Sequence, residues 1–581
     1  MLAAFGSGQL TAPSWLRRGG QSGGQSGGRR GGLLRRLAGP TAFAVLGVVL
    51  FAAYLAHSRI VAASSESGGQ ALQAWDMLHG NLLLHGWTLS DVSFYTTELP
   101  EYMAVELVHG LNNDTVHIAA ALSYTLIVLL AGLLAKGRVT GREGAIRLLV
   151  AVGIMLAPRD TALLLGNPDH TGSHVPLLII FLVVDRARPR WWVPLLVTVL
   201  LTWAQVADTL VLLEGAIPLA VACLLRANLR RGSLAGNWYD LSLAAGAAVS
   251  VAATRLFLSL IQHAGGFTVK PPTVSFVSVN ALSATMFGDV ARLLDVFGAK
   301  FFGLQTGAIM LALVPGLIGF ILAAWGVAAG VRRLYRADTD LIVQVLTIAT
   351  LIVLAAFVVG TKNDTNEVVG LLPLGAVLAG RLLAGPIAAI RLIPVLALAL
   401  AGGVAIVAYS ATRPPDPAQR YKLTASWLAA HDLHYGLAGF WDASIVTVDS
   451  GDRVQVRPVR SFQARIVTTP SESKASWYDP QRHYANFVVA RRRWTCSGVC
   501  VGVRAPIMSF GPPAATYHVG PYTVLVWNKN LLARLRTVSW CNEGWPWNTP
   551  ALPCPAGGIQ GPAGGVQGPA GAVQGPDGGS G

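Results

Sequence analysis

Ionisable side chains gather in two polar stretches of a sequence that is otherwise dominated by apolar residues. The first stretch runs from 66 to 117 and contains Glu66, Asp76 and His79. Asp76 and His79 stand three positions apart, so a helix would place them on one face. These three side chains are the first candidates for catalysis or substrate binding, with Glu66 and Asp76 as the possible catalytic acids.

The second stretch contains two further clusters, Arg159-Asp160 and Asp169-His170. If both stretches emerge on the same side of a membrane, they could converge to supply a general base or to bind a divalent metal ion. The alternative is that these loops are polar because they are solvated, with Arg159 and Asp160 forming a local ion pair. The sequence itself identifies no cofactor.

Charged residues inside apolar runs are a third kind of candidate. Asp208, Glu214 and Arg255 interrupt such runs, and Lys362 lies in a short break between two of them. An ionisable group within a bilayer is costly unless it is paired or lines a wet cavity. Arg255 therefore either pairs with Asp208 or Glu214 as a structural element, which we favour, or binds a phosphate, a role open to Lys362 as well.

Long apolar runs separated by Arg-rich breaks make up most of the chain. Of the 581 residues, 53% are hydrophobic and 13% are charged, whereas a soluble protein carries about a quarter charged residues. A helix needs roughly 20 apolar residues to cross a bilayer. The sequence therefore predicts an α-helical polytopic membrane protein. Its eleven expected spans are 40–56, 116–135, 146–165, 174–185, 191–209, 210–225, 240–262, 306–329, 341–360, 368–383 and 392–410.

The placement of arginine predicts the topology. Every second break between runs is basic, and basic loops stay on the cytoplasmic side. The N-terminus is therefore expected in the cytoplasm, and both the large first outer loop, 57–115, and the segment after 411 are expected outside the plasma membrane. The net charge of +15 is dispersed over these breaks, which argues against nucleic acid as a partner.

Both ends of the chain have compositions that cannot build a core. Residues 1–39 are rich in Gly, Ser and Arg and are expected to form a disordered basic tail. The run 40–56 resembles a signal peptide in length, but the long tail before it favours an uncleaved first span. Residues 555–581 carry a Gly/Pro/Gln-rich repeat of seven residues, which breaks the strict triplet of collagen and indicates a second flexible tail.

The segment 412–554 reads as a small mixed α/β domain on the outer side. Lys422–Leu433 has helical spacing, and four short segments read as strands. Those segments are Ser444–Val448, Val454–Val459, Asn486–Ala490 and Tyr522–Asn528.

Four of the five cysteines cluster near the C-terminus. They are Cys496, Cys500, Cys541 and Cys554. In an oxidising compartment they are expected to form two disulfides. A metal site is the weaker alternative, because the second pair lacks a CxxC spacing.

This layout resembles the GT-C superfamily of membrane glycosyltransferases, which includes protein mannosyltransferases and aminoarabinose transferases. The stretch from Glu66 through Ala71 and Met77 to Gly80 looks like the start of the first outer loop in that superfamily. The segment from Trp427 to Trp441 looks like the start of the outer domain in actinobacterial proteins of this type. Ser65 stands where an acid is usual.

The resemblance implies an enzyme that transfers a sugar from a polyprenyl-phosphate donor to a cell-envelope glycan or protein. Glu66 would be the catalytic acid, with Asp76 as the second choice. Arg159, Arg255 and Lys362 would be the candidates to bind the donor phosphate. The rival hypothesis is a non-enzymatic membrane protein, either a lipid or glycan transporter or a scaffold for the outer domain.

Overall fold

The computed structural model describes residues 28–535 apart from short gaps. Those gaps are 157–160, 167–169, 231–235, 270–274, 303–306, 362–364, 390–392, 413–419, 463 and 493–499. Among the described residues, those from 51 onward form one compact unit, and those before 51 belong to a separate unit. The predicted terminal tails, 1–39 and 555–581, lie largely or wholly outside the described residues.

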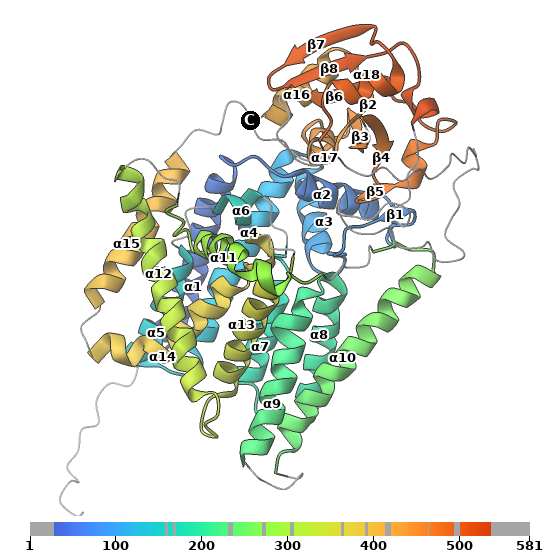
Figure 1. Cartoon of the computed structure of the whole chain (residues 1–581). Coiled ribbons are helices and arrows are strands. Elements are labelled where there is room, and N and C mark those ends of the chain that lie inside the picture. The colour runs from blue at the N-terminus through green and yellow to red at the C-terminus, as the bar shows by residue number, and fades with distance from the viewer. Residues whose placement is uncertain are drawn as a thin grey trace, which may run out of the picture. The chain divides into compact units, whose positions relative to one another are not determined.

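Apolar helices make up most of the described residues before the C-terminal domain, and all eleven predicted runs fall largely on helix (Figure 1). The helices are α1 (Gly28–Ser58), α4 (Asn113–Lys136), α5 (Gly141–Leu156), α6 (Thr161–Gly166), α7 (His174–Arg186), α8 (Trp192–Ala207), α9 (Ile217–Arg230), α10 (Trp238–His263), α12 (Gly307–Arg333), α13 (Leu341–Val359), α14 (Leu371–Ala389) and α15 (Ile393–Thr412).

The lengths of these helices agree with a polytopic membrane protein. Within the described residues, six helices are long and apolar enough to cross a bilayer, and three shorter apolar helices accompany them. The predicted run 146–165 is divided between α5 and α6. The predicted run 210–225 begins with a π-helical segment, η1 (Leu212–Ala216), that continues into α9. The protein is an α-helical polytopic membrane protein with a small C-terminal domain that contains a sheet.

Two helices of the first inter-span segment and one later helix lie outside the apolar spans. They are α2 (Ser65–Leu78), α3 (Glu98–His109) and α11 (Leu282–Val296). The side chain of Ser64 caps α2 by accepting a hydrogen bond from Ser67 N at 3.0 Å, which satisfies one of the free N–H groups of the first turn. On α11, Met286 and Phe287 are 55% and 64% exposed, as expected for a helix that lies at a membrane surface.

The C-terminal domain, here the described residues from Arg420 to Leu535, is built on a six-stranded mixed sheet in the order β4-β3-β2-β6-β8-β7. Its central strand β2 is parallel to both β3 and β6, and the remaining pairs are antiparallel. The strands are β2 (Tyr435–Gly439), β3 (Gln455–Phe462), β4 (Arg465–Thr468), β6 (Phe487–Arg491), β7 (Ala515–Val519) and β8 (Tyr522–Val526). The helices are α16 (Arg420–Ala430), α17 (Phe440–Asp449) and α18 (Arg504–Phe510).

Most of the predicted elements of this domain are confirmed, but one is wrong. The expected helix at 422–433 corresponds to α16, and three of the four expected strands correspond to β3, β6 and β8. The fourth, Ser444–Val448, lies inside α17. Its β-branched residues favour a strand locally, but β2 and β3 are parallel and therefore need a crossover connection. The helix α17 provides that crossover.

The C-terminal domain and the first inter-span segment share one hydrophobic core. It contains Leu72 and Trp87 from the segment together with Ile445, Phe487 and Tyr522 from the domain. A short strand of the segment, β1 (Trp87–Thr88), also pairs antiparallel with β5 (Ser473–Lys474) of the domain. In Figure 1, α17 lies against α2.

Candidate functional site

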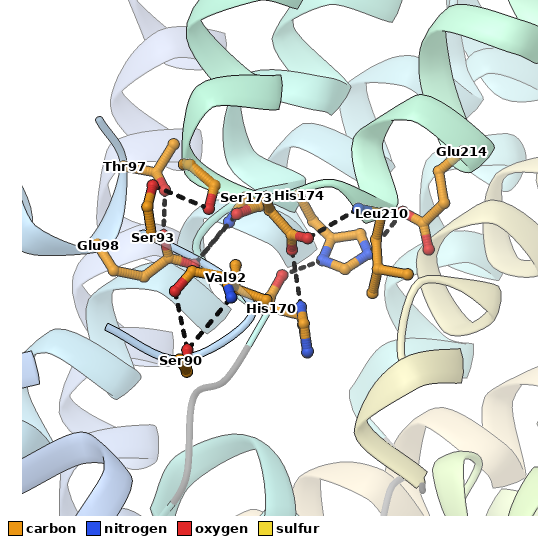
Figure 2. Close-up of polar contacts among 12 residues, drawn as sticks. Ser90, Val92, Ser93, Thr97, Glu98, His170, Ser173, His174, Leu210 and Glu214 are labelled. Atoms are coloured by element: carbon orange, nitrogen blue, oxygen red, sulfur yellow. Dashed lines mark hydrogen bonds and ion pairs between the residues drawn. The ribbon is translucent and has the colours of Figure 1, made fainter. Parts of the chain in front are cut away.

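A group of buried polar side chains lies where α3, the turn 170–174 and the junction between α8 and η1 meet (Figure 2). We call it the acid–histidine cluster. Its members are Glu98, His170, Ser173, His174, Asp208 and Glu214. Each is 9% exposed or less. Most polar groups buried to this degree form hydrogen bonds with protein or with ordered water.

Glu98 connects α3 to the turn 170–174. Its Oε1 accepts hydrogen bonds from Ser173 N at 3.0 Å and from Ser173 Oγ at 3.3 Å, and its Oε2 accepts one from the Thr97 hydroxyl. Burial raises the pKa of Glu98 to about 7, against the lowering effect of the Thr97 hydrogen bond. A Cβ on Gly172 would lie 2.7 Å from Glu98 Cγ, so the turn can approach this closely because residue 172 is glycine.

Two histidines of the turn each contact one acid. His170 Nδ1 lies 2.8 Å from Asp208 Oδ2, and His174 Nε2 lies 2.9 Å from Glu214 Oε2. His174 Nδ1 also lies 2.6 Å from the His170 carbonyl oxygen and must donate its proton there. The approach of His174 Nε2 to Glu214 is therefore favourable when a proton is held between those two groups.

The local backbone explains how these acids enter an apolar region. Asp208 ends α8 and accepts a hydrogen bond from Leu210 N at 2.8 Å, which turns the chain at that point. Glu214 lies in the π-helical segment η1, a rare conformation that often occurs at functional sites. His170 has a φ of 60°, which is uncommon for a residue other than glycine.

Glu66 lies at the start of a helix that contacts α6, the helix between the two clusters of the second polar stretch. It occupies the first turn of α2 and is partly buried. Just before it, Ser64 N donates a hydrogen bond to the Gly166 carbonyl oxygen of α6 at 3.0 Å. Arg159, Asp160 and Asp169, which flank α6 in the sequence, lie outside the described residues, as does Lys362. His170 belongs to the acid–histidine cluster.

Asp76 and His79 are placed away from that cluster. Asp76 Oδ2 accepts hydrogen bonds from Asn81 Nδ2 at 2.6 Å and from Trp87 Nε1 at 2.8 Å, and it forms an ion pair with Lys474 Nζ at 2.7 Å. His79 is exposed, and its ring packs on Trp75 at 4.3 Å between centroids. The contacts of Asp76 are therefore those of a residue that joins the first segment to the C-terminal domain.

The expected pairing of Arg255 is wrong. Its two proposed partners, Asp208 and Glu214, contact His170 and His174 instead, and Arg255 is exposed on α10. The correct partners of Asp208 and Glu214 are histidines, and the sequence does show two histidines in a polar break next to an apolar run. Which residues of the two segments would meet depended on how the helices pack.

The proposed metal and disulfide sites lie mainly outside the described residues. Within the described ranges, no three His, Cys, Asp or Glu side chains are grouped so that they could hold a metal ion. Cys500 is buried, whereas Cys496, Cys541 and Cys554 lie outside those ranges. The cysteine pairing stays a prediction.

Comparison with solved structures identifies the fold. ArnT from Cupriavidus metallidurans, bound to undecaprenyl phosphate, matches with a TM-score of 0.51 at 13% sequence identity, over 84% of this chain and 98% of ArnT. This chain has the GT-C fold. An oligosaccharyltransferase from Archaeoglobus fulgidus, tethered with an acceptor peptide, matches with a TM-score of 0.44 at 10% identity, over 77% of this chain and 69% of its own.

The GT-C resemblance inferred from the sequence is thus confirmed at the level of the fold. No protein-family model matches the chain, and no curated protein matches it in sequence.

Proposed function

We propose that this protein is an integral membrane glycosyltransferase that moves a sugar from a polyprenyl-phosphate donor to a cell-envelope acceptor. The observation that carries the proposal is the GT-C fold, which matches almost the whole of ArnT, a protein solved with undecaprenyl phosphate bound. The buried acid–histidine cluster supports it, because ionisable groups within a membrane domain are costly and usually mark a functional site.

The reaction needs a base for the acceptor and a counter-charge for the leaving group. We assign the base to Glu66, whose carboxylate would take the proton of the acceptor hydroxyl. The acceptor oxygen then forms a bond to the anomeric carbon while the bond from that carbon to the phosphate oxygen breaks. The polyprenyl phosphate leaves with the electron pair, and a basic side chain stabilises its charge. The candidates for that role are Arg159, Arg255 and Lys362.

The acid–histidine cluster would shape the site next to Glu66. Glu98 and Ser173 fix the turn 170–174 against α3. That turn adjoins Asp169 and lies beyond α6, whose last residue, Gly166, binds Ser64 beside Glu66. A fixed turn holds the predicted substrate-binding residues in a constant position, and such preorganisation lowers the barrier of group transfer.

The proposed topology follows from the arginine distribution. The N-terminus would be cytoplasmic, 40–411 would form the membrane domain, and 412–554 would form an extracytoplasmic domain. The acid–histidine cluster would then face the outer leaflet. Two disulfides among Cys496, Cys500, Cys541 and Cys554 would be consistent with that compartment, and a mass shift on alkylation with and without reductant tests them.

The test is transfer by the purified protein from a panel of polyprenyl-phosphate sugars, comparing the wild type with Glu66→Gln. Loss of the base should lower kcat by about 10²- to 10⁴-fold, with melting temperature and membrane insertion unchanged. Glu143→Gln is the matched control, because Glu143 is exposed and its ion pair within the described residues runs along its own helix, to Arg147 at 2.6 Å. It should keep wild-type activity.

A panel without any transfer, or a fully active Glu66→Gln variant, would overturn the proposal in different ways. The first outcome favours the non-enzymatic alternative, a transporter or scaffold. The second outcome keeps the enzyme but moves the base elsewhere.

A further inference from the structure

We propose that the C-terminal domain holds the first turns of α2 in place, so that Ser444 and Ile445 act as positioning residues for Glu66. This inference rests on the proposed function for the role of Glu66. The docking of α2 on the domain is independent of that role and can be tested without it.

The first contact is an approach of backbone to backbone at Gly68. A Cβ added to Gly68 would lie 2.9 Å from Ile445 N, 3.0 Å from Ile445 Cα and 3.1 Å from the carbonyl carbon of Ser444. Backbone atoms within a helix cannot move aside as the end of a side chain can. The separation of α2 and α17 is therefore set by the absence of a side chain at position 68.

The second contact is a hydrogen bond at Ser65, which precedes Glu66 in the first turn of α2. Ser444 N donates to Ser65 Oγ at 3.1 Å, and both residues are buried. Ser65 and Gly68 thus bracket Glu66 within one turn of helix, and both contact α17. Ser64 N binds the Gly166 carbonyl oxygen at 3.0 Å. The start of α2 is held between the C-terminal domain and α6 of the membrane domain.

The other end of α2 is attached to the same domain. Asp76 pairs with Lys474 at 2.7 Å, about 16 Å along the helix from Ser65 at a rise of 1.5 Å per residue. Trp87, which binds Asp76, packs edge-to-face on Trp477 at 4.9 Å. Two separated attachments therefore join α2 to the domain, and the one formed by Ser65 and Gly68 lies beside Glu66.

The docking also explains why α2 contains two glycines that lower its intrinsic helix stability. Gly68 and Gly69 are consecutive in the first half of the helix, and each is less favourable there than Ala by about 1 kcal/mol. At Gly69, however, an added Cβ would meet Glu472 Oε2 at 2.4 Å, the far end of a flexible side chain. The two neighbouring glycines therefore differ in what a methyl group would displace, and this difference provides a matched control.

The experiment compares Gly68→Ala with Gly69→Ala in the full-length protein, with Gly385→Ala as a second control, because a Cβ there meets nothing within 4 Å. Hydrogen exchange measures the docking, and transfer kinetics measure the positioning. Gly68→Ala should speed amide exchange in residues 65–78 by tenfold or more and lower kcat by about 10²-fold, the effect expected of a 1 Å displacement. The KM for the lipid donor should change little. Gly385→Ala should behave as the wild type, and Gly69→Ala, which displaces the end of the buried Glu472 side chain, should change both readouts less than Gly68→Ala does.

Each part of the inference can fail separately. Exchange in α2 that is the same for Gly68→Ala and Gly69→Ala would refute the docking. Faster exchange with an unchanged kcat would refute the positioning role. A wild type without transfer activity would end the proposed function and the positioning role with it, while the exchange data would still decide the docking. If Gly68→Ala fails to fold, Ser65→Ala, which removes only the acceptor for Ser444 N, should give the same pattern at smaller amplitude.

Discussion

The three contacts of Asp76 predict that its removal destabilises the protein without a direct chemical effect. Asp76→Ala leaves the Trp87 indole N–H without its acceptor, and the Trp87 side chain is 2% exposed. An unsatisfied buried donor costs about 1–3 kcal/mol. The same change removes the partner of Lys474, whose side chain is 18% exposed. A charged hydrogen bond of this kind contributes about 1.5–3 kcal/mol, and partial exposure places this pair near the lower value.

Together these losses amount to roughly 2.5–4.5 kcal/mol, with Asn81 adding a smaller loss that water can compensate. Asp76→Asn keeps an oxygen acceptor for Trp87 and loses only the charge, so it should cost about 1–2 kcal/mol. The assay is thermal unfolding in detergent, where Asp76→Ala should lower the melting temperature by several degrees. Lys474→Met in the Asp76→Asn background should restore part of the loss, since no unpaired ammonium then remains.

Kinetics measured well below the lowered melting temperature separate this role from catalysis. Asp76→Asn should retain most of the wild-type kcat there. An Asp76→Ala variant that melts with the wild type and has lost transfer would refute the structural assignment. It would restore Asp76 as a catalytic acid.

Two further predictions concern buried ionisable groups elsewhere. Burial raises the pKa of Glu106 from its usual value of 4.5 to about 9. The folded protein therefore holds the Glu106 proton more tightly than the unfolded chain does, and this contribution to stability is fully present below pH 4.5 and is lost as the pH rises toward 9. Glu106→Gln should raise the melting temperature at pH 8 and change it little at pH 5. Arg381, with a side chain 3% exposed, pairs with Asp185 at 2.7 Å and with Asp340 at 2.5 Å. Arg381→Met should destabilise the helix bundle by about 3–5 kcal/mol, because Asp185 is left buried without a counter-charge, and a melting temperature equal to that of the wild type would contradict this.

The candidate site was partly visible in the sequence. Glu66 and His170 were recognised as chemistry-bearing residues of two polar breaks, and the structure brings those breaks together. The sequence does not indicate that Glu98 fixes the turn 170–174, because nothing in the neighbouring residues shows that a carboxylate in a polar loop will be buried. Asp208 was recognised as costly within an apolar run, but its partner depended on which helix packs beside α8.

The sequence by itself determined the membrane-spanning architecture. Apolar runs of sufficient length become helices in a bilayer whatever surrounds them, because the backbone must satisfy its hydrogen bonds internally. The same local logic correctly placed α16 and the strands β3, β6 and β8.

Only the tertiary structure decided how these elements meet. Ser444–Val448 has the composition of a strand and became a helix because β2 and β3 are parallel. The sequence makes Asp76 the second candidate for the catalytic acid, and the structure adds its ion pair with Lys474, which joins the first inter-span segment to the C-terminal domain. Gly68 is unfavourable within a helix by its own propensity, and the close approach of α17 accounts for its presence there. Each of these outcomes depends on contacts between residues hundreds of positions apart or on sheet pairing, and composition and spacing along the chain carry no record of such contacts.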